Sequence, residues 1–176
     1  LSLGAEHISV YSLIVEEGTR LSDNIDSFPQ IPSDDEDRQM YYMTKEMLSS
    51  YGYEQYEISN YAQKGYECKH NLKYWERCDY LGFGIGAASL YGGRRYTNIS
   101  DIGRYMDVLA EITNALDKSY VNELLQIRTD MEELSKEDEM SEYMFLGLRK
   151  TKGIDITDFK EEFGTDIKDI FGEAIE

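Results

Sequence analysis

The spacing of apolar and polar positions predicts a mixture of strands and helices along the chain. Residues 7–15 (HISVYSLIV) form a nearly continuous run of β-branched and aromatic side chains, which is typical of a strand buried on both faces in a parallel sheet. Residues 1–6 (LSLGAE) have the pattern of a helix end closed by Gly4. A doubly buried strand needs neighbours, and we expect them in sequence that precedes this chain.

A helix is predicted after the loop that carries both prolines. Ser33 and Glu36 have the spacing of a capping box, in which each side chain bonds the backbone of the other residue. The apolar positions that follow recur at helical spacing and predict one buried stripe, made up of Met40, Met43, Met47, Leu48 and Tyr51. Gly52 supplies the stop.

The middle of the chain predicts extended structure. Residues 53–59 alternate enough for a short strand, and residues 80–91 and 94–99 predict a hairpin that turns at the Gly-Gly pair between them. The three glycines of GFGIGAAS lack the spacing of a nucleotide-binding loop and precede a hairpin. We interpret them as backbone accommodation at a tight strand bend; the alternative is a close approach of the main chain to a flat ligand.

The pattern after the hairpin is helical. Ser100 is expected to cap a helix with an apolar face that contains Ile102, Tyr105, Leu109, Ile112 and Leu116. From about residue 120 tyrosine becomes rare and acidic residues crowd, so we place a domain boundary between residues 118 and 119. Ser135 and Asp138 open a further helix, and residues 157–163 and 166–175 predict two short ones. This chain is therefore expected to be α+β, with a helical, winged-helix-like domain at residues 119–176.

Composition narrows the classes of function. The 176 residues include 35 Asp and Glu against 18 Lys and Arg, a net charge of −17, so nucleic acid would meet repulsion. Mean hydropathy is −0.56, and no apolar run reaches the ~20 residues of a membrane-spanning helix. Cys68 and Cys78 suggest neither a disulfide framework nor a zinc motif, and no signal peptide is visible, so we expect a cytoplasmic protein.

Basic side chains concentrate in the middle of the chain. Residues 61–104 contain seven basic and four acidic side chains, a balance of +3, whereas residues 121–176 contain seven basic and sixteen acidic ones, a balance of −9. An anion is expected at the middle segment, and the acidic tail favours a packing or lid module over a DNA-reading one. Arg94 and Arg95 are candidates for binding a carboxylate, because guanidinium can bind it bidentately; the alternative is that both are solvated.

The hexapeptide HNLKYW, residues 70–75, carries the candidate chemistry. In a helix, His70 and Tyr74 share one face, and Asn71 and Trp75 share the adjacent one. A neutral imidazole can ligate haem iron, and Tyr and Trp offer flat surfaces to a macrocycle. The alternative is that Tyr74 and Trp75 belong to the core and His70 is a hydrogen-bonded structural histidine. The other histidine, His7, opens a strand and is expected to be structural.

Five segments in a fixed order resemble a known family. They are HISVYSLIVEEGT, YEISNYA, HNLKYW, DYLGFGIGAAS and MFLGLRKTKGID, and they extend over residues 7–155. By these motifs the chain is identified as similar to the oxygen-independent coproporphyrinogen III oxidase-like proteins, which are radical S-adenosylmethionine proteins. HNLKYW resembles the H-N-x-x-Y-W element of their haem-chaperone subfamily.

The resemblance implies an architecture of the α/β class. Residues 7–15 would be the last strand of a partial (β/α) barrel, residues 53–99 an antiparallel sheet extension within residues 1–118, and residues 119–176 an appended domain. The family binds S-adenosylmethionine and a four-iron four-sulfur cluster held by C-x-x-x-C-x-x-C. This chain has no such triad and resembles only the later half of the family protein. Alone, it is expected neither to assemble the cluster nor to cleave the cofactor.

The resemblance also assigns site residues where the motifs match. The haem-associated element corresponds to His70, Asn71, Tyr74 and Trp75, with His70 as the candidate iron ligand. A neighbouring family element corresponds to Tyr56, Glu57 and Asn60. Arg94 and Arg95 as partners of the haem propionates follow from charge and not from the family pattern.

Two functions of different classes follow. The first is a haem chaperone that binds haem and passes it to acceptor haemoproteins. The alternative is an oxygen-independent coproporphyrinogen III oxidase, which oxidatively decarboxylates propionates in porphyrin biosynthesis. HNLKYW favours the first, because the haem-chaperone branch has this element and true oxidases generally do not. A third interpretation is an acidic protein-interaction segment without a ligand.

Overall fold

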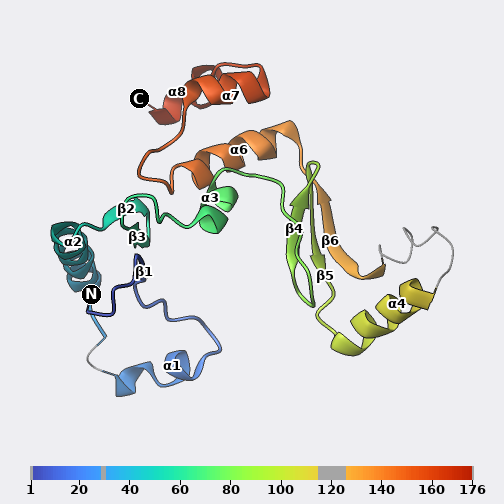
Figure 1. The fold of residues 1–176 in the computed structure, drawn as a ribbon, viewed down its shortest axis with the longest axis horizontal. Helices are drawn as coiled ribbons and strands as arrows, with labels where there is room; N and C mark the ends of the chain where they lie inside the picture. Colours follow the sequence, from blue (N-terminus) through green and yellow to red (C-terminus); the bar gives the residue numbers. More distant parts are fainter. Residues whose placement is uncertain (1, 29–30, 115–125, 176) are drawn as a thin grey trace. The chain divides into compact units, whose positions relative to one another are not determined.

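The computed structural model describes residues 2–28, 31–114 and 126–175, which form two compact units. The first unit consists of Leu1–Leu72 and Arg149–Gly153, and the second of Lys73–Leu148 and Ile154–Glu176. Figure 1 traces both units along the chain. The predicted boundary between residues 118 and 119 lies outside the described residues.

The first unit is built on a three-stranded antiparallel sheet. Its strands have the order β1-β3-β2, with β1 at His7–Ser9, β2 at Glu54–Glu57 and β3 at Asn60–Ala62. Helix α2 (Asp34–Ser50) lies against this sheet in Figure 1, and Leu48, Tyr53 and Tyr61 are buried together there. The shorter helical segments are α1 (Arg20–Asp23) and η1 (Ile25–Ser27).

The strand predicted at residues 7–15 is wrong in its length and its partners. Only His7–Ser9 form a strand, and they pair antiparallel to β3 instead of entering a parallel sheet. Beyond Ser9, the Val10 N–H still bonds the Ser59 carbonyl. Residues 10–15 are exposed, because within the described ranges no further strand lies beside them to pair with an extended backbone.

Helix α2 begins as predicted but buries less than predicted. The capping box is confirmed, since the Ser33 side chain accepts from the Glu36 N–H and the Glu36 carboxylate accepts from the Ser33 N–H. The predicted buried stripe is wrong, because Leu48 is its one buried member; the exposed members are Met40, Met43, Met47 and Tyr51. A helical apolar period indicates which side chains share a face, and it does not supply the surface that covers them.

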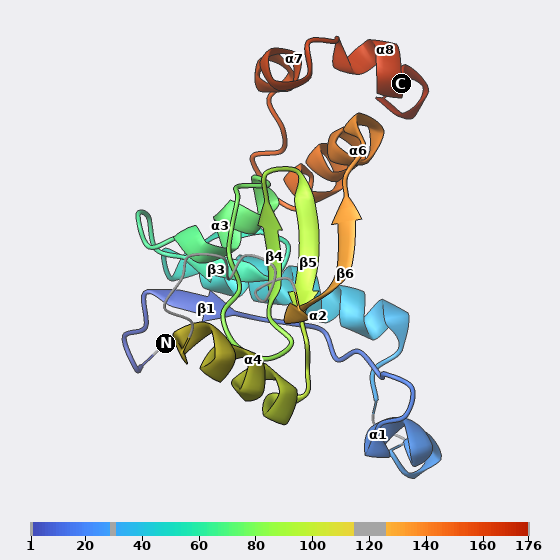
Figure 2. The same ribbon diagram turned by 90° about the vertical axis from the view of Figure 1, so that its right-hand side faces the viewer.

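The second unit contains the predicted hairpin and one strand that was not predicted; the first strand of the hairpin is shorter than predicted, because residues 81–87 are not in a strand. Strands β4 (Ala88–Tyr91) and β5 (Arg94–Asn98) pair antiparallel through a two-residue turn in which both glycines have positive φ. Strand β6 (Arg128–Glu133) adds to β5, giving the order β4-β5-β6 visible in Figure 2. Nearly all side chains of β6 are exposed, so the strand leaves no apolar pattern in the sequence.

In the glycine-rich run before β4, the backbone passes close to another segment of the chain. A Cβ at Gly82 would lie 2.3 Å from the Ala88 carbonyl oxygen. The buried Asn98 side chain donates to the carbonyl oxygens of Gly82 and Gly84, at 3.2 and 2.9 Å. These contacts hold the run against β5.

Helix α4 (Ile102–Asn114) follows β5 and packs through Val108 against Ile99 and Ile127. Ser100 as its cap is wrong, because the Asp101 carboxylate accepts the Arg104 N–H at 2.8 Å. A carboxylate at this position also interacts favourably with the positive end of the helix dipole. The side chain predicted at Leu116 lies outside the described residues.

Three helices close the chain around a core of aromatic residues. They are α6 (Lys136–Gly147), α7 (Ile156–Phe163) and α8 (Ile167–Ile175), and all three were predicted. Met140, Phe159, Phe163 and Ile167 are buried together. Ser135 and Asp138 form the predicted capping box, and Gly164 ends α7 in the left-handed conformation. No helix of the described part is long and apolar enough to cross a bilayer.

Candidate functional site

The candidate site is centred on α3, the helix formed by HNLKYW. The hexapeptide lies in a helix with bounds Lys69–Trp75, which is the arrangement considered for it as one possibility in the sequence. His70 is exposed, whereas Asn71, Tyr74 and Trp75 are half-buried. The division between the two units falls inside α3, so His70 and Asn71 belong to the first unit and the two aromatic residues to the second.

Tyr56 holds the start of α3. Its hydroxyl oxygen accepts the Cys68 N–H at 3.3 Å and a hydrogen bond from the Asn71 side chain, and it lies 2.9 Å from His7 Nε2. Burial raises the pKa of the Tyr56 phenol, and the hydrogen bonds from Cys68 and Asn71 oppose that shift. The structure therefore brings together Tyr56 and Asn71, two of the residues singled out in the sequence.

Glu57 and Asn60 form a buried polar pair beside Tyr56. Their exposed fractions are 1% and 2%. Glu57 Oε1 accepts from the Asn60 side-chain amide and from the Ser59 N–H, and the Ser9 hydroxyl donates to Asn60 Oδ1. A buried carboxylate is stabilised by such donors, so these two residues shape the turn between β2 and β3.

Arg77 lies just after the C-terminal end of α3 and ends the helix. It has a positive φ of 51°, the Arg77 N–H bonds the Tyr74 carbonyl, and the Cys78 N–H reaches back to the Lys73 carbonyl. These two bonds are those of a Schellman motif, in which the left-handed position is usually glycine. A non-glycine residue is strained there, so other contacts of Arg77 must offset the cost.

Those contacts are ion pairs with the C-terminal helices of the second unit. The guanidinium is 7% exposed and lies 3.4 Å from Glu139, 3.4 Å from Glu142 and 3.0 Å from Glu162. The buried Glu142 carboxylate also pairs with Arg95 at 2.7 Å. Glu142 therefore ties the end of α3 and strand β5 to helix α6.

The two candidate propionate partners have different surroundings. Arg94 is exposed and lies 3.9 Å from Glu133 across the β5–β6 pair. Arg95 is about one-third exposed and is already paired with Glu142. The Tyr74 ring packs edge-on against Tyr80 at 4.7 Å within this unit.

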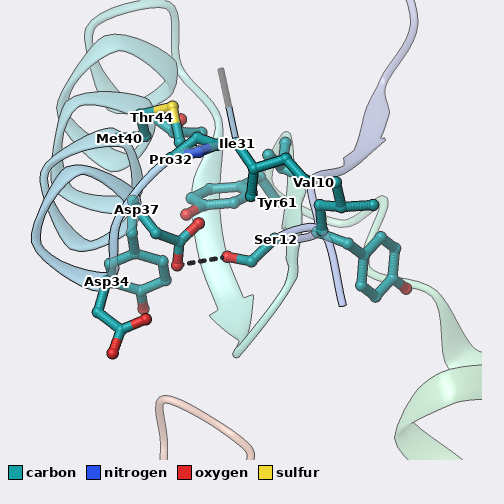
Figure 3. Close-up of a pocket in the computed structure, with 12 residues that line it drawn as sticks. Val10, Ser12, Ile31, Pro32, Asp34, Asp37, Met40, Thr44 and Tyr61 are labelled. Atoms are coloured by element: carbon teal, nitrogen blue, oxygen red, sulfur yellow. Dashed lines mark hydrogen bonds between the residues drawn. The ribbon is translucent and has the colours of Figure 1, made fainter. Parts of the chain in front are cut away.

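A pocket of about 440 Å³ lies in the first unit between α2 and residues 10–13. Figure 3 shows Ser12 and Asp37 bonded at this pocket, where the hydroxyl donates to the carboxylate at 2.9 Å, with Tyr61 and Met40 also in its lining. Asp34 and Asp37 make the lining acidic and unfavourable for an anion. The residues predicted to bind a ligand do not line it.

Sequence reasoning missed two residues that hold the end of α3, Arg77 and Glu142. His7 was assigned a structural role at the start of a strand. Arg77 is separated from Glu142 by 65 positions, so no local spacing connects them. The one available signal was the +3 balance of the middle segment against the acidic tail, which favours pairing between the two.

The donor set of this chain fits haem iron and does not fit an iron–sulfur cluster. Within the described ranges, no group of three or more His, Cys, Asp or Glu side chains is placed to hold a metal ion. The two cysteines are too few for the thiolate ligands of a four-iron cluster. A single exposed imidazole on a helix that also carries Tyr74 and Trp75 is a donor that haem iron accepts.

Comparison with known proteins finds relatives along the whole chain. The model of the HemN C-terminal domain matches residues 134–176. The chain is 38% identical over 176 residues to the heme chaperone HemW of Bacillus subtilis (strain 168), covering 99% of this chain and 43% of that protein. It is 34% identical over 176 residues to the heme chaperone HemW of Lactococcus lactis subsp. lactis (strain IL1403), with the same coverage. The chain spans less than half the length of these curated relatives.

A solved structure shares the fold. Coproporphyrinogen III oxidase (HemN) from Escherichia coli, a radical SAM enzyme, superposes with a TM-score of 0.64 at 17% identity, over 99% of this chain and 40% of that one. Identity this low supports similarity of fold alone. The predicted fold class is confirmed by this match.

Proposed function

This chain is a homologue of the heme chaperones HemW, and on that premise we propose that it is part of a protein that binds haem in the cytoplasm and passes it to acceptor haemoproteins. The observation that carries the proposal is the HNLKYW helix, in which an exposed imidazole is combined with half-buried aromatic side chains.

Each residue of the proposed site has a role set by its chemistry. His70 would ligate the haem iron through a neutral imidazole nitrogen. Tyr74 and Trp75 would pack on the macrocycle, and Asn71 would orient the start of the helix through Tyr56. Arg94 and Arg95 would pair with the propionates, since guanidinium binds carboxylate through parallel hydrogen bonds.

Similarity to the relatives also suggests what the other parts of the full-length protein do. S-adenosylmethionine and a four-iron cluster would be bound by parts of the full-length protein other than this chain. Residues 1–118 would form the end of the barrel and its sheet extension. Residues 119–176 would form the appended helical domain, in keeping with the HemN C-terminal domain match at residues 134–176.

Haem titration of the full-length protein tests the proposal. We expect a 1:1 complex with a Soret band that shifts in His70→Ala, with at least about tenfold weaker binding, or about 1.4 kcal/mol. Lys69→Ala is the matched control, because Lys69 is the exposed neighbour of His70 on the same helix and has no assigned role. An unchanged Soret band and affinity in His70→Ala would overturn the ligand assignment.

An oxidase is the second candidate, favoured by the HemN C-terminal domain match. Such an enzyme would remove propionate carboxylates from coproporphyrinogen III. Product analysis under anaerobic conditions separates the two functions. Protoporphyrinogen formed over multiple turnovers would reverse the ranking, whereas haem binding without turnover supports the chaperone.

A further inference from the structure

The Tyr56 hydroxyl is the point at which three segments of the first unit meet. Its oxygen accepts from the Cys68 N–H and from the Asn71 side chain, and it lies 2.9 Å from His7 Nε2. A phenol has one proton to donate and two acceptor positions. With the Cys68 N–H on one acceptor position of this oxygen, the hydroxyl proton is available to His7 Nε2, which lies at hydrogen-bond distance.

The sheet brings His7 and Tyr56 together although 49 positions separate them. His7 in β1 and Glu54 in β2 both pair with Ala62 of the central strand, so β1 and β2 flank a small residue. The register of β2 shifts between Gln55 and Glu57, which makes Tyr56 the bulged residue. A bulge redirects a side chain, and here the Tyr56 ring lies 5.7 Å from the His7 ring at 55°.

The Tyr56 hydroxyl fixes both the residue before α3 and a side chain in its first turn. The Cys68 carbonyl accepts the Leu72 N–H at 3.1 Å, so the hydroxyl contacts the same residue that begins the hydrogen-bond ladder of the helix. Asn71 is the residue next to His70. The position of the His70 backbone therefore depends on where the Tyr56 oxygen is held.

We propose that His7 is a positioning residue for α3: by accepting the Tyr56 hydroxyl proton, it orients the oxygen that holds Cys68 and Asn71, and thereby sets the approach of His70 to haem iron. The inference rests on the proposed function for its ligand. Its geometry belongs to the first unit alone. Partners that orient metal-binding histidines typically change metal affinity by about 10–100-fold.

Two substitutions at position 7 separate the hydrogen bond from the packing of the ring. His7→Phe keeps a flat ring and removes the acceptor, so haem binding by the full-length protein should weaken about tenfold. His7→Gln restores an acceptor oxygen and should keep the affinity within about threefold of the original, a difference of ~0.6 kcal/mol. Tyr53→Phe is the matched control, because the Tyr53 hydroxyl donates to the Ala5 carbonyl in the same unit.

A double-mutant cycle tests whether His7 acts through Tyr56. Tyr56→Phe should weaken haem binding at least as much as His7→Phe, and the double variant should bind no more weakly than Tyr56→Phe alone. A residue that only supports the fold would give losses that add. Additive losses, or full affinity in His7→Phe, would overturn the inference.

The exchange of backbone amide hydrogens tests the positioning role without any haem bound. In His7→Phe, the amides of residues 68–72 should exchange faster while those of β4 and β5 do not change. If the unaltered protein binds no haem, the proposed function fails, and unchanged exchange at residues 68–72 would then reject the positioning role as well. Haem binding in the unaltered protein together with unchanged affinity and exchange in His7→Phe would reject the positioning role alone.

Discussion

At the scale of single residues, Arg77 combines a backbone role with a charge role. It occupies the left-handed position that ends α3, and its guanidinium is buried among three glutamates. Glycine would satisfy the backbone without supplying the charge. The presence of Arg here indicates that its ion pairs with α6 and α7 outweigh the strain of a positive φ.

Replacing Arg77 separates the two roles. Arg77→Ala should lower the free energy of unfolding by about 3 kcal/mol, at the lower end for a broken buried ion pair because Arg95 still neutralises Glu142. Arg77→Gly should recover about 1 kcal/mol of that loss by relieving the strain. Denaturant unfolding measures both, with Arg38→Ala as the control, since Arg38 pairs with Asp35 on the surface. Equal losses in the Ala and Gly variants would show that backbone strain does not matter at this position.

At the scale of elements, α6, α7 and α8 form a core of their own. Phe159 is fully buried and contacts the rings of Tyr143, Phe163 and Phe171 edge-on or tilted. The start of α6 and the end of α7 could be predicted from the sequence. The capping box of α6 involves residues only three positions apart, and Gly164 immediately follows α7. The aromatic packing between the helices depends on how the intervening loops turn, so it was not predicted.

A pair of phenylalanines tests this core. Phe159→Ala should lower the free energy of unfolding by about 3–5 kcal/mol, because a large buried ring leaves a cavity. Phe145→Ala removes the same side chain from the exposed surface of α6 and should change it by about 0.5 kcal/mol or less. Thermal or denaturant unfolding of both variants gives the comparison. Similar losses from the two would contradict the burial of Phe159.

At the scale of the whole molecule, apolar surface is left uncovered in the first unit. Tyr11, Leu13 and Ile14 are between 62% and 76% exposed, and Met43 and Met47 of α2 are exposed as well. Exposed apolar side chains of this kind favour binding of other apolar molecules. The sequence pattern that predicted a doubly buried strand at residues 7–15 was thus a correct description of the side chains and a wrong description of their surroundings.

Charged side chains in residues 10–15 should weaken the binding of apolar molecules to this surface. In the 176-residue chain, Leu13→Asp combined with Ile14→Asp should reduce the fluorescence of a bound hydrophobic dye, and should change the free energy of unfolding by only about 0.5 kcal/mol. Ile156→Asp is the control, because Ile156 is a comparably exposed apolar residue on α7. Equal dye binding in all three proteins would show that residues 10–15 contribute no apolar surface.

Local patterns in this chain determined its local structure. The capping boxes at Ser33 and Ser135 and the Gly-Gly hairpin turn formed as predicted, because each depends on residues within about four positions of one another. The family motifs likewise singled out Asn71 and, in a neighbouring element, Tyr56, although they did not say how the two residues interact.

The connections between segments were decided only in three dimensions. His7 reaches Tyr56 across 49 positions because the strand order is β1-β3-β2 and β2 contains a bulge, and Arg77 reaches Glu142 across 65. Strand register and bulges depend on the balance of many weak contacts over the sheet, and one shifted residue turns a side chain to the other face. For that reason the residues that hold α3 in place could be identified only from the folded chain.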